Sequence, residues 1–225
     1  MNLIHTIYRP PGAGHHPTIL TLHGRGANAF DLLGLAPYLC GGKFLIICPQ
    51  APLETPIGPE AIGYAWYNAN KGGVPDTDGM LESRRALQVF LDDCLQQYPI
   101  DPTRLAVLGF SQGGVMAYSL ALTEPERFAG LAALSTWLPK ELTPRLHISA
   151  AVQSLPTLVQ HGTKDPQIEV DRARDSVARL RELQVPLIFK EYQMGHEIGS
   201  KGLYDLSAWL QEKVRATGGR SPLQV

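Results

Sequence analysis

Apolar segments of strand length alternate with segments of helical length along most of this chain. Seven segments have the length and side chains of strands: 3–8, 18–22, 44–47, 105–108, 130–134, 157–160 and 187–192. Five segments have helical length or spacing: 29–39, 79–97, 112–122, 169–183 and 201–215. This alternation is typical of a mostly parallel sheet flanked by helices, and the continuously apolar strand at 44–47 fits a sheet covered on both faces. We therefore predict an α/β fold.

The size of the chain favours a single domain. Its 225 residues, 44% of them hydrophobic, are enough to bury one substantial core. We expect one α/β domain over residues 1–215, without a large cap domain, followed by a flexible tail at 216–225. The segment 49–78 is rich in proline and glycine. We predict that it is one long functional or flexible loop without regular secondary structure.

Charge and hydropathy argue against several classes of partner. The net charge is −1 and no basic run is present, so we expect no binding to nucleic acid. The apolar run 44–48 is far too short to span a membrane, and the N-terminal residues do not resemble a signal peptide. Cys40, Cys48 and Cys94 form no C-x-x-C pair, so we expect buried thiols in a reducing cytosol. We expect a cytoplasmic protein without metal or cofactor, and a homodimer is compatible with the sequence.

The segment 109–113 reads GFSQG and matches the pattern G-x-S-x-G. This pattern alone is weak, because a glycine-rich turn with an idle serine would match it equally well. Here the segment lies between the predicted strand 105–108 and the predicted helix 112–122. A serine on such a strand-to-helix turn has a strained backbone and an exposed hydroxyl. The context therefore favours Ser111 as a nucleophile.

A nucleophilic serine needs a base, and histidine is the side chain suited to that role near neutral pH. In a strand–turn–helix setting the usual chain order is serine, then acid, then histidine. Three histidines follow Ser111, and His147 and His161 are more simply explained as structural residues. His196 lies in a glycine-containing loop between the strand 187–192 and the last predicted helix. We predict that His196 is the general base.

Asp165 is the candidate acid that orients the histidine. It follows the strand 157–160 and should lie at the same sheet edge as Ser111 and His196. The alternative interpretation is that Asp165 caps the next helix, with Pro166 at the first helical position. Glu169 is a less favoured substitute for the acid.

Acyl transfer also requires donors for the developing oxyanion. The backbone N–H of Gln112, directly after the nucleophile, is one natural donor. The segment 23–28 reads HGRGAN and follows the strand 18–22. Its glycines allow close approach of the backbone, and the N–H of Arg25 is the best second donor. The side chain of Arg25 is more simply a surface cation.

Together these motifs resemble the carboxylesterase/acyl-protein thioesterase family of α/β-hydrolases, also called the phospholipase/carboxylesterase family. The resemblance covers residues 18–214 and is carried by six motifs in order: HGRG at 23–26, PQAP at 49–52, AWY at 65–67, GFSQGG at 109–114, HGTKDP at 161–166 and MGHEI at 194–198. It implies an α/β-hydrolase fold with Ser111 as nucleophile, His196 as base and Asp165 as its partner. It also implies that the N–H groups of Arg25 and Gln112 form the oxyanion hole.

The resemblance implies further that Trp66, Trp137 and Leu138 help to form the acyl pocket, although ordinary packing would also explain each tryptophan. Two positions depart from the thioesterase members. Arg25 stands where those members usually have an apolar residue, and Ala27 stands in a stretch where they often have an acidic one. These departures favour a hydrolase of small esters.

The sequence thus predicts a serine hydrolase that cleaves carboxylic esters with short to medium acyl chains through an acyl-enzyme. The nearest alternative is an acyl-thioesterase or a lysophospholipase that uses the same three side chains. A non-catalytic binding or interaction protein on a hydrolase scaffold is a further alternative, because fold does not dictate function.

Overall fold

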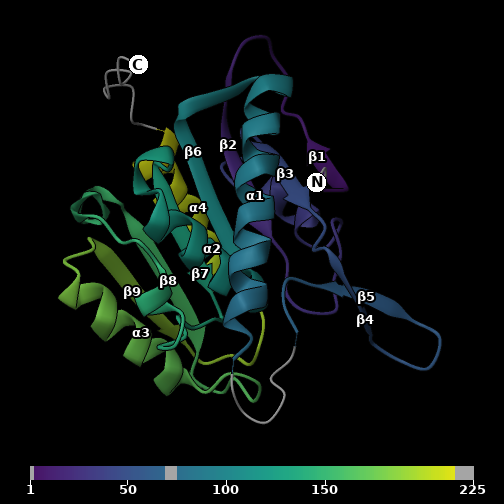
Figure 1. Cartoon of the computed structure of the whole chain (residues 1–225). Helices are drawn as coiled ribbons and strands as arrows, with labels where there is room; N and C mark the ends of the chain where they lie inside the picture. The colour runs from purple at the N-terminus through teal and green to yellow at the C-terminus, as the bar shows by residue number, and fades with distance from the viewer. Residues whose placement is uncertain (1–2, 69–74, 216–225) are drawn as a thin grey trace.

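The computed structural model describes residues 3–68 and 75–215, and its centre is a seven-stranded sheet (Figure 1). The spatial order of the strands is β1-β3-β2-β6-β7-β8-β9. Only β1 runs antiparallel to its neighbour β3, and the other paired strands are parallel. This mostly parallel sheet confirms the predicted fold class. The strands are β1 (His5–Tyr8), β2 (His16–Leu22), β3 (Leu45–Pro49), β6 (Ile100–Phe110), β7 (Gly130–Leu134), β8 (Thr157–Gly162) and β9 (Leu187–Tyr192).

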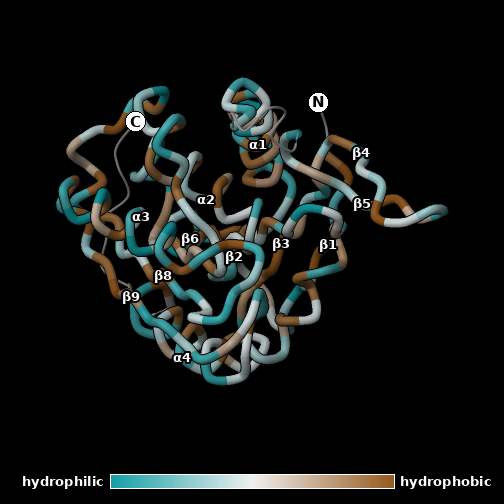
Figure 2. Tube along the Cα trace, turned by 90° about the horizontal axis from the view of Figure 1, so that it is seen from below, coloured by the Kyte–Doolittle hydropathy of each residue, from teal (hydrophilic) through white to brown (hydrophobic). Residues whose placement is uncertain are grey.

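Helices cover both faces of the sheet (Figure 2). One face packs against α1 (Thr77–Gln97), α2 (Gln112–Thr123) and α3 (Val170–Glu182). The other face packs against α4 (Ser200–Leu210) and the 3₁₀ helix η1 (Leu32–Tyr38). Successive side chains of a strand point to opposite faces, so the strands supply both cores and read as continuous apolar runs. The remaining elements are short: η2 (Pro125–Arg127), η3 (Thr143–Arg145), η4 (Ala150–Ser154) and the π-helical η5 (Gln211–Arg215).

The segment 49–78 is not the unstructured loop that the sequence predicts. It contains a hairpin of β4 (Leu53–Pro56) and β5 (Ile62–Ala65), which projects from the body of the molecule (Figure 1). A bridge between Ala27 and Tyr64 joins the hairpin to the loop after β2. Four-residue strands rich in proline and glycine carry too little periodicity to be recognised from sequence. Part of the predicted loop, 69–74, and the predicted tail, 216–225, lie outside the described residues.

Two further predictions are corrected. The helix predicted at 29–39 is only the 3₁₀ helix η1, and Pro37 within it has no N–H to donate to an α-helical hydrogen bond. Cys48 and Cys94 are buried as predicted, but Cys40 is half-buried, with its Sγ donating to the carbonyl of Ser207. No helix within residues 3–68 and 75–215 is long and apolar enough to cross a membrane.

Candidate active site

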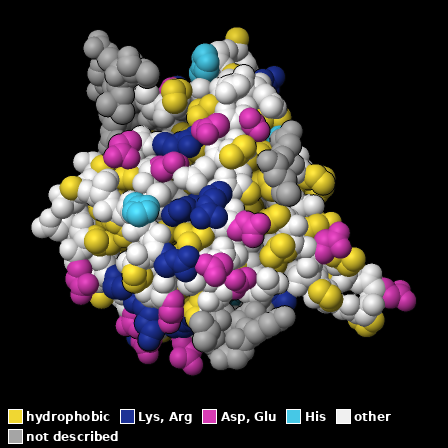
Figure 3. Space-filling model, viewed as in Figure 1, with side chains coloured by type: hydrophobic (Ala, Val, Ile, Leu, Met, Phe, Trp, Pro, Cys, Tyr) yellow, Lys and Arg dark blue, Asp and Glu magenta, His cyan; other side chains and the backbone are white. Residues whose placement is uncertain are grey.

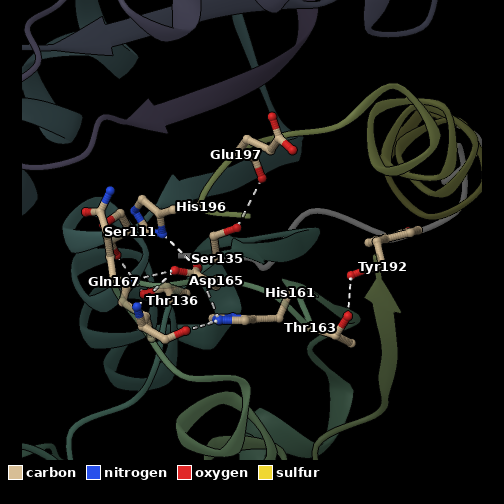
Figure 4. A network of polar contacts seen from close by, with 11 residues as sticks. Ser111, Ser135, Thr136, His161, Thr163, Asp165, Gln167, Tyr192, His196 and Glu197 are labelled. Carbon is tan, nitrogen blue, oxygen red and sulfur yellow. Dashed lines mark hydrogen bonds and ion pairs between the residues drawn. The ribbon is translucent and has the colours of Figure 1, made fainter. Parts of the chain in front are cut away.

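Ser111 occupies a strained turn between β6 and α2. Its φ of 53° and ψ of −120° lie in a region that residues other than glycine seldom adopt. Neighbouring groups hold this conformation. The N–H of Ser111 donates to Leu134 O at 3.0 Å, and its carbonyl accepts from Thr136 Oγ1 at 2.6 Å (Figure 4). The backbone is thus fixed by the residues at and beyond the end of β7.

Gly113 allows the start of α2 to lie directly against the end of β2. A Cβ at this position would overlap the carbonyl oxygens of Leu22 and His23. The close approach explains why glycine is required two residues after the serine. It also brings the segment that follows β2, with Gly24 and Arg25, next to the serine turn.

His196 and Asp165 form a hydrogen-bonded pair, with Nδ1 of the imidazole 2.7 Å from Oδ2 of the carboxylate (Figure 4). The carboxylate is buried, and its other oxygen accepts from the N–H groups of Gln167 and Ile168, both at 2.9 Å. Burial alone would raise the pKa of Asp165. The hydrogen bonds from Ile168, His196 and Gln167 outweigh burial and hold this pKa below its ordinary value. Asp165 is therefore a charged acceptor in contact with the imidazole.

Asp165 does not cap α3, which was the alternative interpretation. That helix begins at Val170 with Glu169 at the N-cap position, and the Glu169 side chain makes no capping hydrogen bond. The backbone donors that Asp165 accepts from belong instead to the short turn at 165–168. The structure therefore gives Asp165 both a local turn and the contact with His196, and it gives Glu169 neither.

Backbone contacts hold the loops of Asp165 and His196 together. Thr163 N donates to Tyr192 O at 2.8 Å, and Lys164 N donates to Met194 O at 3.1 Å. On the side of the serine, the ring of Phe110 lies 4.9 Å from the imidazole of His196 between centroids. His196 thus contacts the residue directly before Ser111. No hydrogen bond among the described residues joins Ser111 to His196 itself.

His161 lies beneath the pair, a contact that the sequence did not predict. Its side chain is completely buried, with Nε2 2.8 Å from Ile168 O and 3.4 Å from Asp165 Oδ2. The position agrees with the structural role predicted for His161. The spacing of four residues from Asp165 was the available signal, but it indicates a contact only once the turn after β8 is known.

The segments that carry the two predicted oxyanion donors both lie next to Ser111. A Cβ added to Gly24 would meet Ser111 Cβ at 3.4 Å, so the segment preceding Arg25 lies against Ser111. The Arg25 side chain is exposed, as expected of a surface cation, and its guanidinium donates to Thr55 Oγ1 of β4 at 2.9 Å. The contacts of the Gln112 side chain were not predicted, because the sequence assigned a role only to the backbone N–H of this residue. The side chain accepts from Trp66 N and donates to Tyr67 O, each at 2.8 Å.

The three residues predicted to contact substrate have different surroundings. Trp66 is fully buried, and its indole N–H donates to His23 O at 2.9 Å, so it has no exposed surface in this conformation. The imidazole of His23 bonds Gly24 O and Ala51 N, and burial lowers its pKa. Trp137 and Leu138 line a cavity of about 270 Å³. Trp66 and His23 therefore support the loops around the site, while Trp137 is half-buried at the cavity and Leu138 lies buried in its wall.

A mostly parallel sheet with a strained serine turn between β6 and α2, and a histidine–aspartate pair beyond β8 and β9, defines an α/β-hydrolase. Comparison with known families narrows this class. Residues 5–214 match the model of the phospholipase/carboxylesterase family. The chain belongs to this family of ester hydrolases.

Named relatives span nearly the whole chain. Acyl-protein thioesterase 1 of Gibberella zeae is 26% identical over 91% of this chain and 94% of its own length. A probable carboxylesterase of Oryza sativa subsp. japonica is 26% identical over 88% of this chain and 78% of its own length. Among solved structures, esterase PE8 aligns with a TM-score of 0.81 at 24% identity over 95% of this chain and 100% of its own. Acyl-protein thioesterase 2 of Zea mays aligns with a TM-score of 0.75 at 25% identity over 93% and 98%.

Proposed function

We propose that the chain is a carboxylesterase that cleaves small esters with short to medium acyl chains, using Ser111, His196 and Asp165. The observation that carries this proposal is the strained serine turn next to a formed histidine–aspartate pair. A charged Asp165 fixes the imidazole with its Nδ1 protonated, so that Nε2 is available as a base. The family match supports hydrolysis of ester bonds by such a site.

The reaction has two steps. His196 takes the hydroxyl proton as Ser111 Oγ attacks the acyl carbonyl, and the backbone N–H groups of Arg25 and Gln112 stabilise the oxyanion. His196 then donates that proton to the leaving alkoxide, which departs as the alcohol and leaves an acyl-serine. Water activated by His196 releases the acid and restores the hydroxyl.

We also propose that the protein is located in the cytosol, because three cysteines without a C-x-x-C pair suit a reducing compartment.

The test is the variant Ser111→Ala, with ethyl pentanoate or 4-nitrophenyl butyrate as substrate. We expect kcat to fall about 10⁴-fold or more, because the nucleophile is removed. A fluorophosphonate probe should label the wild type at Ser111, as shown by peptide mass spectrometry. The control is Ser149→Ala, which alters an exposed serine that bonds only a local backbone N–H. Unchanged turnover in Ser111→Ala would overturn the proposal.

The names of two relatives favour a second candidate, an acyl-thioesterase. The machinery would be the same, and only the leaving group would differ. Ratios of kcat/KM for matched acyl esters and acyl-thioesters of equal chain length separate the two. A preference for short esters supports the carboxylesterase, and a preference for long-chain thioesters or lysolipids supports the alternative.

A further inference from the structure

One cavity, lined mainly by the segment after β7 and by α3, is rich in cationic side chains. It has a volume of about 270 Å³ and lies between the segment after β7 and α3, which contributes residues from its first turn to its last. Its lining contains three cations and two carboxylates, alongside apolar surface. The lining residues are Pro75, Trp137, Leu138, Pro139, Lys140, Glu141, Arg172, Asp175 and Arg179.

The two arginines of this cavity are fixed by uncharged partners. The guanidinium of Arg172 lies over the ring of Trp137, 4.0 Å from its centroid. Arg179 donates through one terminal nitrogen to the carbonyl of Leu138. No ion pair within residues 3–68 and 75–215 involves Arg172, Arg179 or Lys140. Their charges are therefore not neutralised by a direct protein partner.

Arg174, on the same helix, differs from Arg172 and Arg179 because its guanidinium is paired with carboxylates. It bonds both carboxylate oxygens of Glu191 at 2.8 Å and a carboxylate oxygen of Asp171 at 2.8 Å. In Figure 3, dark blue and magenta side chains are mixed over the region of α3. The surface of this helix thus pairs one arginine with carboxylates and leaves Arg172 to face the cavity.

The positive charge of the arginines also acts on buried groups behind the cavity. Burial raises the pKa of the Tyr67 hydroxyl, and Arg172 opposes this rise. Burial likewise raises the pKa of the Tyr118 hydroxyl, and Arg179 opposes the rise. Neither Glu141 nor Asp175 contributes to these shifts, although both line the cavity. At Tyr67 the carboxylate of Asp76 adds to the rise in pKa, so the two arginines are the lining residues whose charge reaches these buried hydroxyls.

Two series of contacts link residues at the cavity to Ser111 and to its neighbour Gln112. On one side, Trp137 directly follows Thr136, whose hydroxyl donates to Ser111 O. On the other side, Gln112 donates to the carbonyl of Tyr67, the residue that is under the influence of Arg172. From these contacts we expect the cavity to lie within reach of a small ester bound at Ser111.

We propose that this cavity, called here the arginine pocket, binds an anionic group of the substrate, so that the enzyme prefers esters carrying a carboxylate or a phosphate. The inference rests on the proposed esterase function and names its substrate class. Arg172, aligned by stacking on Trp137, presents the planar donor edge that recognises carboxylate and phosphate oxygens. Lys140, an exposed residue of the lining, adds a further positive charge.

The test compares matched pairs of esters that differ only in charge, with acid release followed by titration. Monoethyl glutarate against ethyl pentanoate examines a carboxylate in the acyl part. Acetylglycerol 3-phosphate against monoacetylglycerol examines a phosphate in the alcohol part. We expect kcat/KM to favour the anionic member of at least one pair by about tenfold, mainly through KM. The preferred pair identifies the source of the anionic group, and added salt should reduce the preference.

The informative variant is Arg172→Gln, and the matched control is Arg174→Gln two positions along the same helix. Arg172→Gln should lower the ratio of kcat/KM between the anionic and the neutral member of the preferred pair about tenfold, so that the two members are hydrolysed at similar rates. Arg172→Met keeps the apolar contact with Trp137 and should behave like Arg172→Gln, which separates charge from packing. Arg174→Gln should retain the preference. Equal turnover of charged and neutral esters by the wild type would overturn the inference, as would a preference that survives in Arg172→Gln.

The failure of this inference is distinguishable from the failure of the esterase proposal. Hydrolysis of neutral esters without a preference for anionic ones overturns the pocket assignment alone. Absence of any hydrolysis and of probe labelling at Ser111 overturns the esterase. In that case calorimetry with glutarate decides the pocket: binding that is lost in Arg172→Gln supports it, and no binding to the wild type refutes it.

Discussion

Asp165 combines two tasks that depend on its being ionised. One carboxylate oxygen accepts from two backbone N–H groups of the turn at 165–168, and the other accepts from His196. Hydrogen bonds to a carboxylate are strong because the acceptor is charged. The turn therefore fixes the carboxylate, and the carboxylate in turn fixes the orientation of the imidazole.

The variant Asp165→Asn should separate these tasks. The amide oxygen can still accept from Gln167 and Ile168, so we expect the fold to be retained. The charge that favours the protonated Nδ1 of His196 is lost, and kcat should fall about 10⁴-fold with little change in KM. Steady-state kinetics and urea denaturation of the same preparation measure both effects.

A suitable control is Asp171→Asn, which alters an exposed carboxylate of the next helix that bonds only Arg174. It should leave kcat within twofold of the wild type. If Asp165→Asn had wild-type kcat, the role assigned to the carboxylate would be wrong.

The candidate site was predictable where a short pattern determines the local backbone. G-x-S-x-G predicts the strained turn at Ser111, and the positions of Asp165 and His196 follow from the carboxyl ends of predicted strands. The contact of His161 with Asp165 was not predictable, because it depends on how the turn after β8 folds back. Arg172 was equally hidden, since one arginine on a charged helix looks like any other until Trp137 is placed beneath it.

At the scale of elements, the hairpin β4–β5 supports the loop that carries Arg25. Gly26 N donates to Tyr64 O at 2.8 Å, and Tyr64 N donates to Ala27 O at 2.9 Å. The loop thus pairs with β5 through an isolated antiparallel bridge. A Cβ on Gly63 would overlap the carbonyl of Gly26, so the pairing is close.

Replacing that glycine, Gly63→Ala, should separate the hairpin from the loop and displace the N–H of Arg25. Loss of one oxyanion donor typically lowers kcat about 10²-fold, and we expect an effect of that order. Gly58→Ala, at the hairpin tip, is the control, since the new Cβ would meet only Ala61 Cβ at 3.9 Å. Kinetics of the two variants with one neutral ester provide the comparison, and equal kcat values would refute this role of the hairpin.

The prediction of elements succeeded where apolar runs are long. The strands at 130–134 and 187–192 were predicted with the bounds that the structure has. Strand β6 begins five residues earlier than predicted. Its first residue, Ile100, pairs with His16, a contact distant in sequence, and the residues 101–104 that follow are too polar to be recognised as a strand. The hairpin was missed since its short strands are stabilised by each other and by Ala27 rather than by their own pattern.

On the scale of the whole molecule, carboxylates with lowered pKa link stability to pH. Burial would raise the pKa of Asp101, of Asp165 and of Asp205. Hydrogen bonds and ion pairs outweigh burial in each case, with Thr103 and Arg104 acting on Asp101, and Tyr192 and Lys190 on Asp205. Each group therefore binds its proton less readily in the folded chain than in the unfolded chain.

The sign of the pH dependence follows from this difference. The contribution of these groups is complete above the ordinary carboxyl pKa of 3.8 and is lost as pH falls from there through the lower folded values. The free energy of unfolding should therefore decrease as pH falls below about 4. Asp101→Asn should flatten this decrease. Urea denaturation between pH 3 and pH 7 measures it, and an equally steep decrease in Asp101→Asn would contradict the assignment.

The segment after β7 has consequences for how such an enzyme could change over time. Thr136 donates to the carbonyl of Ser111, and Trp137, its immediate neighbour, forms one wall of the arginine pocket. Mutations on that wall would disturb catalysis together with selectivity, so few substitutions would be tolerated there. The opposite wall, on exposed turns of α3, has no such second role in catalysis. New substrate preferences would therefore evolve most readily through positions 172 and 175, with the chemistry left intact.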